Sequence, residues 1–317
     1  MIEKTKVDNL YHCEHIKGAI DTHIHGGPCL FKRIADDEEI AIAARDAGLE
    51  AVMIKSHSTD TSRSAYFVNK HVSGIKIFGG ITLNWSVGGI NPSAVRTALD
   101  FGGKEVWMPT YDAKNHADFF GGTGAWGTYD IPESERLTDA HGGSHLDFEI
   151  GDKGKRPGIS ILKNGSLTEK ILEVVDLVRE YNAIIGTSHL SKKEISILVQ
   201  HAKKLSGIKI LITHPLYRVP DCDSKFLKTV VGDGVYAEIA AATIHPTITN
   251  KTVSDQVELI KTLGAENCIF CSDGGIVYAP MPHEMIRIGA RMLNNTGITN
   301  EELYTMMKKN PRKVLDI

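Results

Sequence analysis

The sequence predicts an α/β protein, a (β/α)8 TIM barrel with a long loop inserted after its fourth strand. The first observation is a series of apolar, β-branched runs, at 19–25, 51–57, 75–83, 105–110, 183–189, 208–214, 235–240 and 268–273. The second is that stretches with helical periodicity separate most of these runs. Strands that alternate with helices form a parallel sheet with right-handed crossovers, and a count of eight favours a closed barrel.

The expected helices repeat their apolar residues every three to four positions, at 38–47, 92–101, 167–181, 192–205, 254–263 and 282–293. An open doubly wound sheet is the main alternative to a barrel. Such a sheet usually carries a glycine-rich dinucleotide-binding turn after its first strand, and this sequence has none there. The barrel is therefore the favoured fold.

The segment 113–165 interrupts this alternation. It is rich in glycine, contains scattered aromatic residues, and is too long for an ordinary strand-to-helix connection. Its place after the fourth strand puts it on the C-terminal face of the predicted barrel. We expect a lid, or a loop that shapes the pocket or an oligomer contact, within one domain that spans residues 1–317.

Composition indicates a cytoplasmic enzyme. Of the 317 residues, 42% are hydrophobic and 24% charged, which is typical of a globular enzyme with a sizeable core. A net charge of −3 gives no electrostatic argument for binding nucleic acid or an anionic membrane. The start of the chain lacks an apolar signal-peptide core, and the five cysteines show no disulfide-like spacing. We expect a homo-oligomer that acts on a small molecule.

The most informative motif is Asp-Thr-His-Ile-His-Gly-Gly-Pro at 21–28, at the end of the first apolar run. Side chains two apart on a strand point to the same face, so His23 and His25 project together. Two neutral imidazoles on one face are half of a zinc-type site. The value of the motif depends on whether later strands also end in ligands.

Several later strands do end in ligand-type side chains. Lys55 and His57 share a face at the end of the second strand, and His189, His214 and Asp273 follow the fifth, sixth and eighth. A single histidine is more often structural, and Asp273 alone could equally begin a turn. Because C-terminal strand ends converge on the mouth of a barrel, their joint placement favours a divalent metal site with an open position for water.

In this arrangement the chain resembles the amidohydrolase superfamily of metal-dependent barrels. That superfamily has His-x-His after strand one, histidines after strands five and six, and an aspartate after strand eight. The matching residues are His23, His25, His189, His214 and Asp273. The ending 309–315 is similar to the Asn-Pro-Ala-x-x-Leu tail of that group, so the resemblance covers about residues 19–317. More narrowly, the chain resembles an uncharacterised bacterial and archaeal branch.

The resemblance implies a metal-dependent hydrolase that cleaves an amide, cyclic amide or ester bond of a small, anionic metabolite. The metal would be held by His23, His25 and His189 with Asp273, which would also act as general base and acid. His214 would complete a second metal site or polarise the substrate carbonyl. A decarboxylase or hydratase on the same barrel is the alternative. A non-catalytic metal-binding protein is a third, but the complete ligand set argues against it.

One departure from the superfamily concerns the bridging residue. The superfamily often has a bridging lysine or glutamate on strand four. Here the fourth strand offers no obvious one, and its candidates are Asp112 and, beyond it, His116. This favours one ion over two. Lys55 is expected to bind a substrate anion as an ammonium group, and a carbamylated bridge is the alternative. The imidazole-rich ligands favour zinc, with manganese or iron as alternatives. The remaining expected pocket residues are His57, Asn84, Trp85, Asp112, His116 and Glu238. For Trp85 and Glu238 a structural role is an equally strong alternative.

Overall fold

The computed structural model describes residues 14–124, 156–245 and 251–317. Its central element, within these ranges, is a set of parallel strands in two paired groups. The first group contains β1 (Ile20–Ile24), β2 (Ala51–Ile54) and β3 (Lys76–Phe78). The second group contains β4 (Gly80–Thr82), β5 (Glu105–Trp107), β8 (Ile184–Gly186), β9 (Lys209–Ile212), β10 (Val235–Ala240) and β11 (Cys268–Cys271).

The two groups join at both ends. One residue, Gly79, separates β3 from β4, so the single strand expected at 75–83 pairs with β2 in its first half and with β5 in its second. On the other side, β1 meets β11 just beyond their ends. There the Asp273 amide donates to the His23 carbonyl at 2.9 Å, and the His25 amide donates to the Gly274 carbonyl at 2.8 Å. The order of neighbours is that of the predicted barrel.

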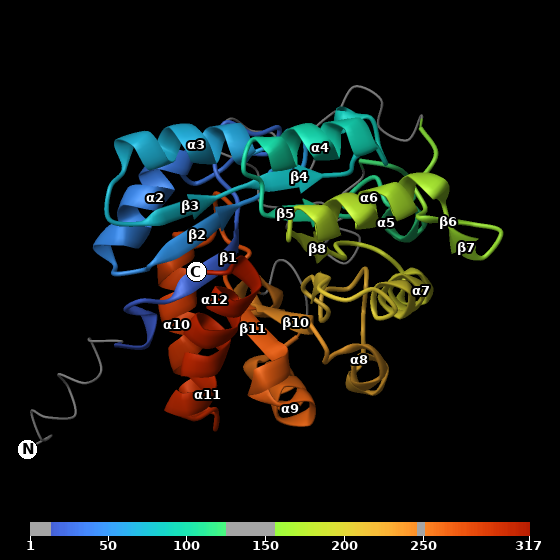
Figure 1. The fold of residues 1–317 in the computed structure, drawn as a ribbon. Helices are drawn as coiled ribbons and strands as arrows, with labels where there is room; N and C mark the ends of the chain where they lie inside the picture. The colour runs from blue at the N-terminus through green and yellow to red at the C-terminus, as the bar shows by residue number, and fades with distance from the viewer. Residues whose placement is uncertain (1–13, 125–155, 246–250) are drawn as a thin grey trace, which may run out of the picture.

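Helices surround the strands, as Figure 1 shows. They are α2 (Asp37–Asp46), α3 (Ser62–His71), α4 (Pro92–Asp100), α5 (Lys114–Phe120), α6 (Glu169–Glu180), α7 (Lys192–Ala202), α8 (Ser224–Val230), α9 (Val253–Leu263), α10 (Pro282–Asn295), α11 (Asn300–Tyr304) and α12 (Asn310–Leu315). Several begin with a capping box. Before α2, Asp36 forms one with Glu39 of the first helical turn, which satisfies backbone N–H groups that have no partner inside the helix.

The helices α3, α5, α8, α11 and α12 lie outside the helical ranges expected from the sequence. The buried faces of α3 and α8 show why the patterns missed them. On α3, Tyr66 and Phe67 are about half exposed, so the apolar pattern does not follow the buried face. The helix α8 is short and buries only Leu227 and Val230. A helix is recognised from its sequence when one apolar face continues over several turns, and neither α3 nor α8 has such a face.

The core has an inner and an outer part. Inside the ring of strands, α12 packs Val314 and Leu315 against apolar residues of several strands, among them Ile20 on β1 and Ile269 on β11. A larger cluster lies between the strands and the surrounding helices. This packing closes the N-terminal end of the barrel and leaves the polar side chains at the C-terminal end.

The expected insertion at 113–165 is described only at its two ends. It begins with α5, and Ile159 pairs with the backbone next to this helix through the amide of Lys114 at 2.7 Å. A short hairpin of β6 (Leu162–Lys163) and β7 (Ser166–Leu167) ends the segment and leads into α6. Residues 125–155 lie outside the described residues, so the lid stays a prediction.

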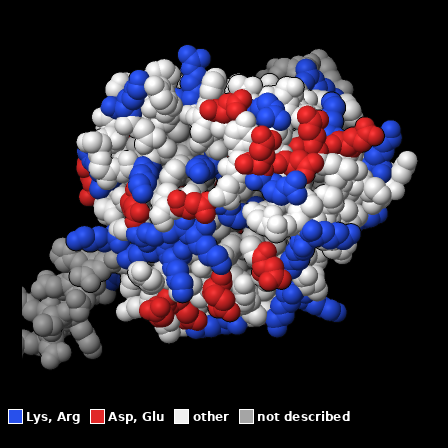
Figure 2. All heavy atoms as spheres, viewed as in Figure 1, with Lys and Arg blue, Asp and Glu red and all other residues white. Residues whose placement is uncertain are grey.

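The surface mixes charges of both signs. In Figure 2, basic side chains are bordered by acidic ones over the visible face. Several pairs are in contact, such as Lys261 with Glu302 at 2.8 Å and Lys209 with Asp316 at 2.6 Å. Among the described helices, none is both long and apolar enough to cross a membrane.

Candidate metal centre at the barrel mouth

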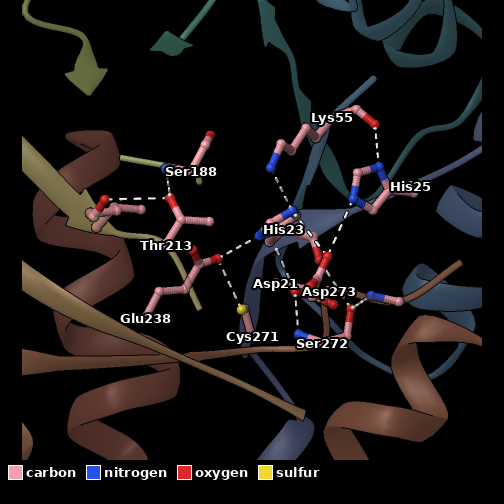
Figure 3. A network of polar contacts seen from close by, with 12 residues as sticks. Asp21, His23, His25, Lys55, Ser188, Thr213, Glu238, Cys271, Ser272 and Asp273 are labelled. Atoms are coloured by element: carbon pink, nitrogen blue, oxygen red, sulfur yellow. Dashed lines mark hydrogen bonds and ion pairs between the residues drawn. The ribbon is translucent and has the colours of Figure 1, made fainter. Parts of the chain in front are cut away.

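The centre of the site is a group of two histidines and one aspartate at the junction of β1 and β11. We call His23, His25 and Asp273 the metal group. His23 is the fourth residue of β1, His25 follows the strand, and Asp273 lies two residues beyond β11. The Nε2 atoms of His23 and His25 lie 3.1 and 3.3 Å from Oδ1 of Asp273. Figure 3 shows the three side chains converging on one point. One ligand atom from each lies within 4.8 Å of the others, a spacing that fits a metal ion.

The backbone at three strand ends is unusual. Ser188, His214 and Asp273 follow β8, β9 and β11 and have positive φ angles of 48°, 31° and 50°. Non-glycine residues rarely adopt this region, and such strained positions concentrate at functional sites. Nearby, Gly275 has φ 111°, and a Cβ there would overlap the His25 carbonyl. Glycine therefore permits the close approach of the β11 end to the His-x-His segment.

The partners of the Nδ1 atoms determine which nitrogens can bind a metal. His25 Nδ1 lies 2.9 Å from the backbone carbonyl of Lys55, which can only accept a hydrogen bond. His23 Nδ1 lies 2.8 Å from Oε1 of Glu238. Burial raises the pKa of Glu238, but the neighbouring His23 outweighs burial, and the pKa lies below its usual range. Both histidines therefore donate through Nδ1 and direct the Nε2 lone pair toward Asp273.

The metal group brings two imidazole lone pairs and a carboxylate oxygen into contact. These three acceptors repel one another unless a cation lies between them. In the structure Lys55 supplies it, with Nζ 3.2 Å from His23 Nε2. The Lys55 side chain is buried and its ammonium also lies over the Trp107 ring at 5.5 Å. Burial lowers the pKa of Lys55, while the carboxylates of Asp273 and Glu238 oppose that effect. The donor set fits a divalent metal, because neutral imidazoles and a carboxylate are ordinary zinc ligands.

The other two predicted ligands lie next to this group. The His214 ring stacks on His23 with centroids 5.9 Å apart and lies 5.1 Å from the His189 ring. Burial lowers the pKa of His214 to about 4, which keeps it neutral. His214 Nδ1 is buried and has no hydrogen-bond partner in the described part of the chain. His189 Nδ1 contacts His116 Nδ1 at 2.7 Å, so His116 orients His189.

A second group of possible ligands lies on the Nδ1 side of His23. It contains His23, Glu238 and Cys271, all buried. The Cys271 thiol donates to Oε1 of Glu238 at 3.0 Å. Burial raises the pKa of this thiol well above its usual value, so Cys271 is a neutral donor and not a thiolate. The group therefore holds His23 in place from behind.

The remaining predicted pocket residues lie on the side of β2 and β5. The His57 ring stacks on His25 with centroids 4.7 Å apart. Asn84 is fully buried and hydrogen-bonds to the His57 carbonyl at 2.9 Å. Asp112 accepts a hydrogen bond from the Trp85 amide at 2.8 Å, and burial raises the pKa of Asp112 to about 6. These residues surround the metal group but are not part of it.

Sequence reasoning assigned no role to several residues that contact the histidines, and Tyr217 and Thr110 are two examples. The Tyr217 ring lies 5.4 Å from His189 and 5.3 Å from His214. Thr110 hydrogen-bonds to His57 Nδ1 at 3.0 Å. Neither has a metal-binding side chain, and Tyr217 lies in a turn that no periodic pattern marks. Only their position after β9 and β5, on the face where barrel enzymes bind ligands, could have indicated them.

Comparison with solved structures identifies the fold first. An amidohydrolase from Pseudomonas aeruginosa superposes with a TM-score of 0.62 at 13% identity, over 96% of this chain and 97% of the other. A probable 2-pyrone-4,6-dicarboxylic acid hydrolase from Acinetobacter baumannii gives a TM-score of 0.60 at 10% identity, over 95% and 100% of the two chains. An amidohydrolase from Burkholderia multivorans with bound zinc gives 0.56 at 9% identity, over 94% and 99%.

These likenesses confirm the predicted fold, which this chain shares with solved structures of amidohydrolases. Residues 18–238 match the model of a family of unknown function, DUF6282, and the chain belongs to that family. The matched residues include His23, His25, His189 and His214, whereas Asp273 lies beyond them. No curated protein matches the sequence significantly.

Proposed function

We propose that the protein is a metal-dependent hydrolase that cleaves an amide, cyclic amide or ester bond in a small anionic metabolite. The observation that carries the proposal is the convergence of His23, His25 and Asp273, with both Nε2 lone pairs directed at Oδ1 of Asp273. The zinc bound by the Burkholderia amidohydrolase, on the same fold, supports a divalent metal here. We name zinc because imidazole ligands suit it better than magnesium or calcium.

His23, His25 and Asp273 would hold the metal. His189 and His214 border the same space, and His214 offers a buried ring nitrogen either to the metal or to the substrate carbonyl. A divalent metal at this position would supply Lewis acidity and would lower the pKa of the attacking water toward neutrality.

Asp273 is the general base and acid of the proposed reaction. The charges of the Lys55 ammonium and of the Asp273 carboxylate attract each other, which favours the ionised form of Asp273. The carboxylate is therefore ionised at neutral pH and able to accept the proton of the attacking water. It then passes that proton to the leaving nitrogen or oxygen as the bond breaks.

The substrate is proposed to carry a negative charge. Lys55 places a buried ammonium beside the ligand group, and a buried cation is stabilised by an anion brought into contact with it. The hydrolase from Acinetobacter named for a pyrone dicarboxylic acid supports this choice, because a pyrone is a cyclic ester and its substrate is a dicarboxylate.

The test combines metal analysis with a substrate screen. Protein purified without chelator is analysed for transition metals, then incubated with a panel of carboxylate-bearing lactones, cyclic amides and esters. We expect bound zinc, with release of an acid or an amine that stops when the metal is removed. The proposal is refuted if the protein contains no zinc, manganese, iron, cobalt or nickel and takes up none of them on addition. Release of carbon dioxide from benzoate-type acids without hydrolysis would support a decarboxylase instead.

A further inference from the structure

His57 is held by a chain of hydrogen bonds that fixes where its proton lies. The chain begins at Asn84, which is fully buried. The Oδ1 atom of Asn84 accepts from the Thr110 amide at 2.9 Å. A backbone amide can only donate, so this contact fixes which end of the Asn84 side chain is oxygen and which is nitrogen.

The orientation of Asn84 determines the next step. Its Nδ2 group donates to the His57 carbonyl at 2.9 Å and to Oγ1 of Thr110 at 2.7 Å. The Thr110 hydroxyl therefore receives a hydrogen bond from Asn84 and has one hydrogen of its own. Its other partner is His57 Nδ1, at 3.0 Å.

The direction of the last hydrogen bond follows from burial. Thr110 is fully buried, and a buried hydroxyl hydrogen without an acceptor is unfavourable. Donation from Thr110 to His57 Nδ1 satisfies both groups, whereas the reverse direction would leave the hydroxyl hydrogen without an acceptor among the described residues. The Nδ1 atom of His57 thus accepts, and the proton of the neutral ring lies on Nε2.

We infer that Asn84 and Thr110 hold His57 as the Nε2–H tautomer, which makes it a hydrogen-bond donor to a carboxylate or carbonyl oxygen of a ligand at the metal. The inference rests on the proposed function for the presence of that ligand. The His57 ring stacks on His25, which places it beside the metal group. A protonated Nε2 has no lone pair, so His57 is not a metal ligand through this atom. Asn84 and Thr110 are positioning residues.

The backbone of His57 is fixed as firmly as its ring. Its carbonyl accepts from Asn84 Nδ2 and also from the Tyr111 hydroxyl at 3.3 Å. The Phe31 ring packs edge-on against His57, with centroids 5.6 Å apart. A donor held in this way loses little conformational freedom when a ligand binds, which is the property expected of a specificity-determining group.

The primary test is the ring nitrogen spectrum of zinc-loaded protein labelled with ¹⁵N-histidine, with the His57 signals assigned through His57→Gln. We expect a protonated Nε2 and an unprotonated Nδ1. Thr110→Ser keeps the hydroxyl and is expected to keep this pattern. Asn84→Asp replaces the donor by an acceptor, so the Thr110 hydrogen turns toward residue 84 and a protonated Nδ1 appears at His57. A protonated Nδ1 in the wild type, or Asn84→Asp with the wild-type pattern, overturns the inference.

The second measurement uses acetohydroxamate, which presents two oxygens to a metal. We expect this probe to shift the His57 Nε2–H signal and to bind about tenfold more weakly to Asn84→Asp, the value of one hydrogen bond. Equal affinity in both proteins overturns the role as donor to a ligand. The zinc content of each sample separates this failure from that of the proposed function. If the protein binds no zinc, the proposed hydrolase function is refuted. The nitrogen spectrum of the same protein still tests the inference about the His57 tautomer.

Discussion

Glu238 is expected to control metal affinity although it does not face the metal group. Its Oε1 atom lies 2.8 Å from His23 Nδ1, and both side chains are 1% exposed. Solvent therefore screens this interaction very little. The carboxylate keeps the His23 proton on Nδ1 and increases the basicity of Nε2. Replacing Glu238 by Gln keeps an acceptor of the same size at Oε1 but removes the negative charge.

The expected effect follows from that difference. A hydrogen bond to an ionised partner is roughly twice as strong as one between neutral groups. The Gln amide would also place two hydrogens where Oε2 of Glu238 is buried without a partner among the described residues. Loss of a carboxylate behind a ligating histidine typically weakens metal binding by about 10- to 100-fold, or about 1.4–2.8 kcal/mol. We expect Glu238→Gln to fall in this range.

The assay is competition for zinc between the protein and a chromophoric chelator of known affinity, with circular dichroism as the test of folding. Cys271→Ser is the matched control, because a serine hydroxyl still donates to Oε1 of Glu238, as the thiol does at 3.0 Å. It is expected to change zinc affinity by less than about threefold. Wild-type affinity in Glu238→Gln would refute the role of Glu238. A larger loss in Cys271→Ser would show that the ion lies in the His23, Glu238 and Cys271 group.

Three further outcomes are expected. Asp273→Asn keeps zinc but lowers turnover of the screened substrate by about 100- to 10,000-fold, the usual rate contribution of general acid–base catalysis. Near-normal turnover would show that another residue is the base. Lys55→Met keeps zinc and raises KM for that substrate, whereas lost zinc, with wild-type activity stimulated by bicarbonate, would indicate a carbamylated bridge. Gly275→Ala introduces strain at φ 111° and a clash with the His25 carbonyl, so urea unfolding should show a loss greater than about 1–3 kcal/mol. Gly102→Ala, at φ 89° with open space around it, should lose only the strain.

Much of the fold was predictable because buried parallel strands appear as short apolar runs. All eight expected strands correspond to strands among the described residues, with one of them divided at Gly79. The helices α3 and α8 were missed because an exposed aromatic pair and a short length hide their buried faces. Local patterns also gave no indication that β3 and β4 pair with different neighbours, since pairing depends on how the whole ring closes.

The candidate ligands were predictable in type and in order, but their partners were not. His23 and Glu238 are 215 residues apart in the sequence, and only the closure of the barrel brings Oε1 behind the ring. The contact between His116 and His189 likewise depends on α5 packing beside the end of β8. Residue type thus predicts what a side chain is able to do, whereas the tertiary neighbours determine which atom of it is available.

His25 and His57 illustrate this distinction. They follow neighbouring strands, and their rings are stacked with centroids 4.7 Å apart. At His25 the neighbour of Nδ1 is a backbone carbonyl, which takes the proton and leaves Nε2 with a lone pair for a metal. At His57 the neighbour of Nδ1 is the Thr110 hydroxyl. This hydroxyl accepts from Asn84 and donates to Nδ1, so the ring proton lies on Nε2. Two stacked imidazoles thereby acquire opposite roles, one as a ligand for a cation and the other as a donor to an anion. Metal and anionic substrate can then occupy adjacent positions without either histidine changing its protonation state.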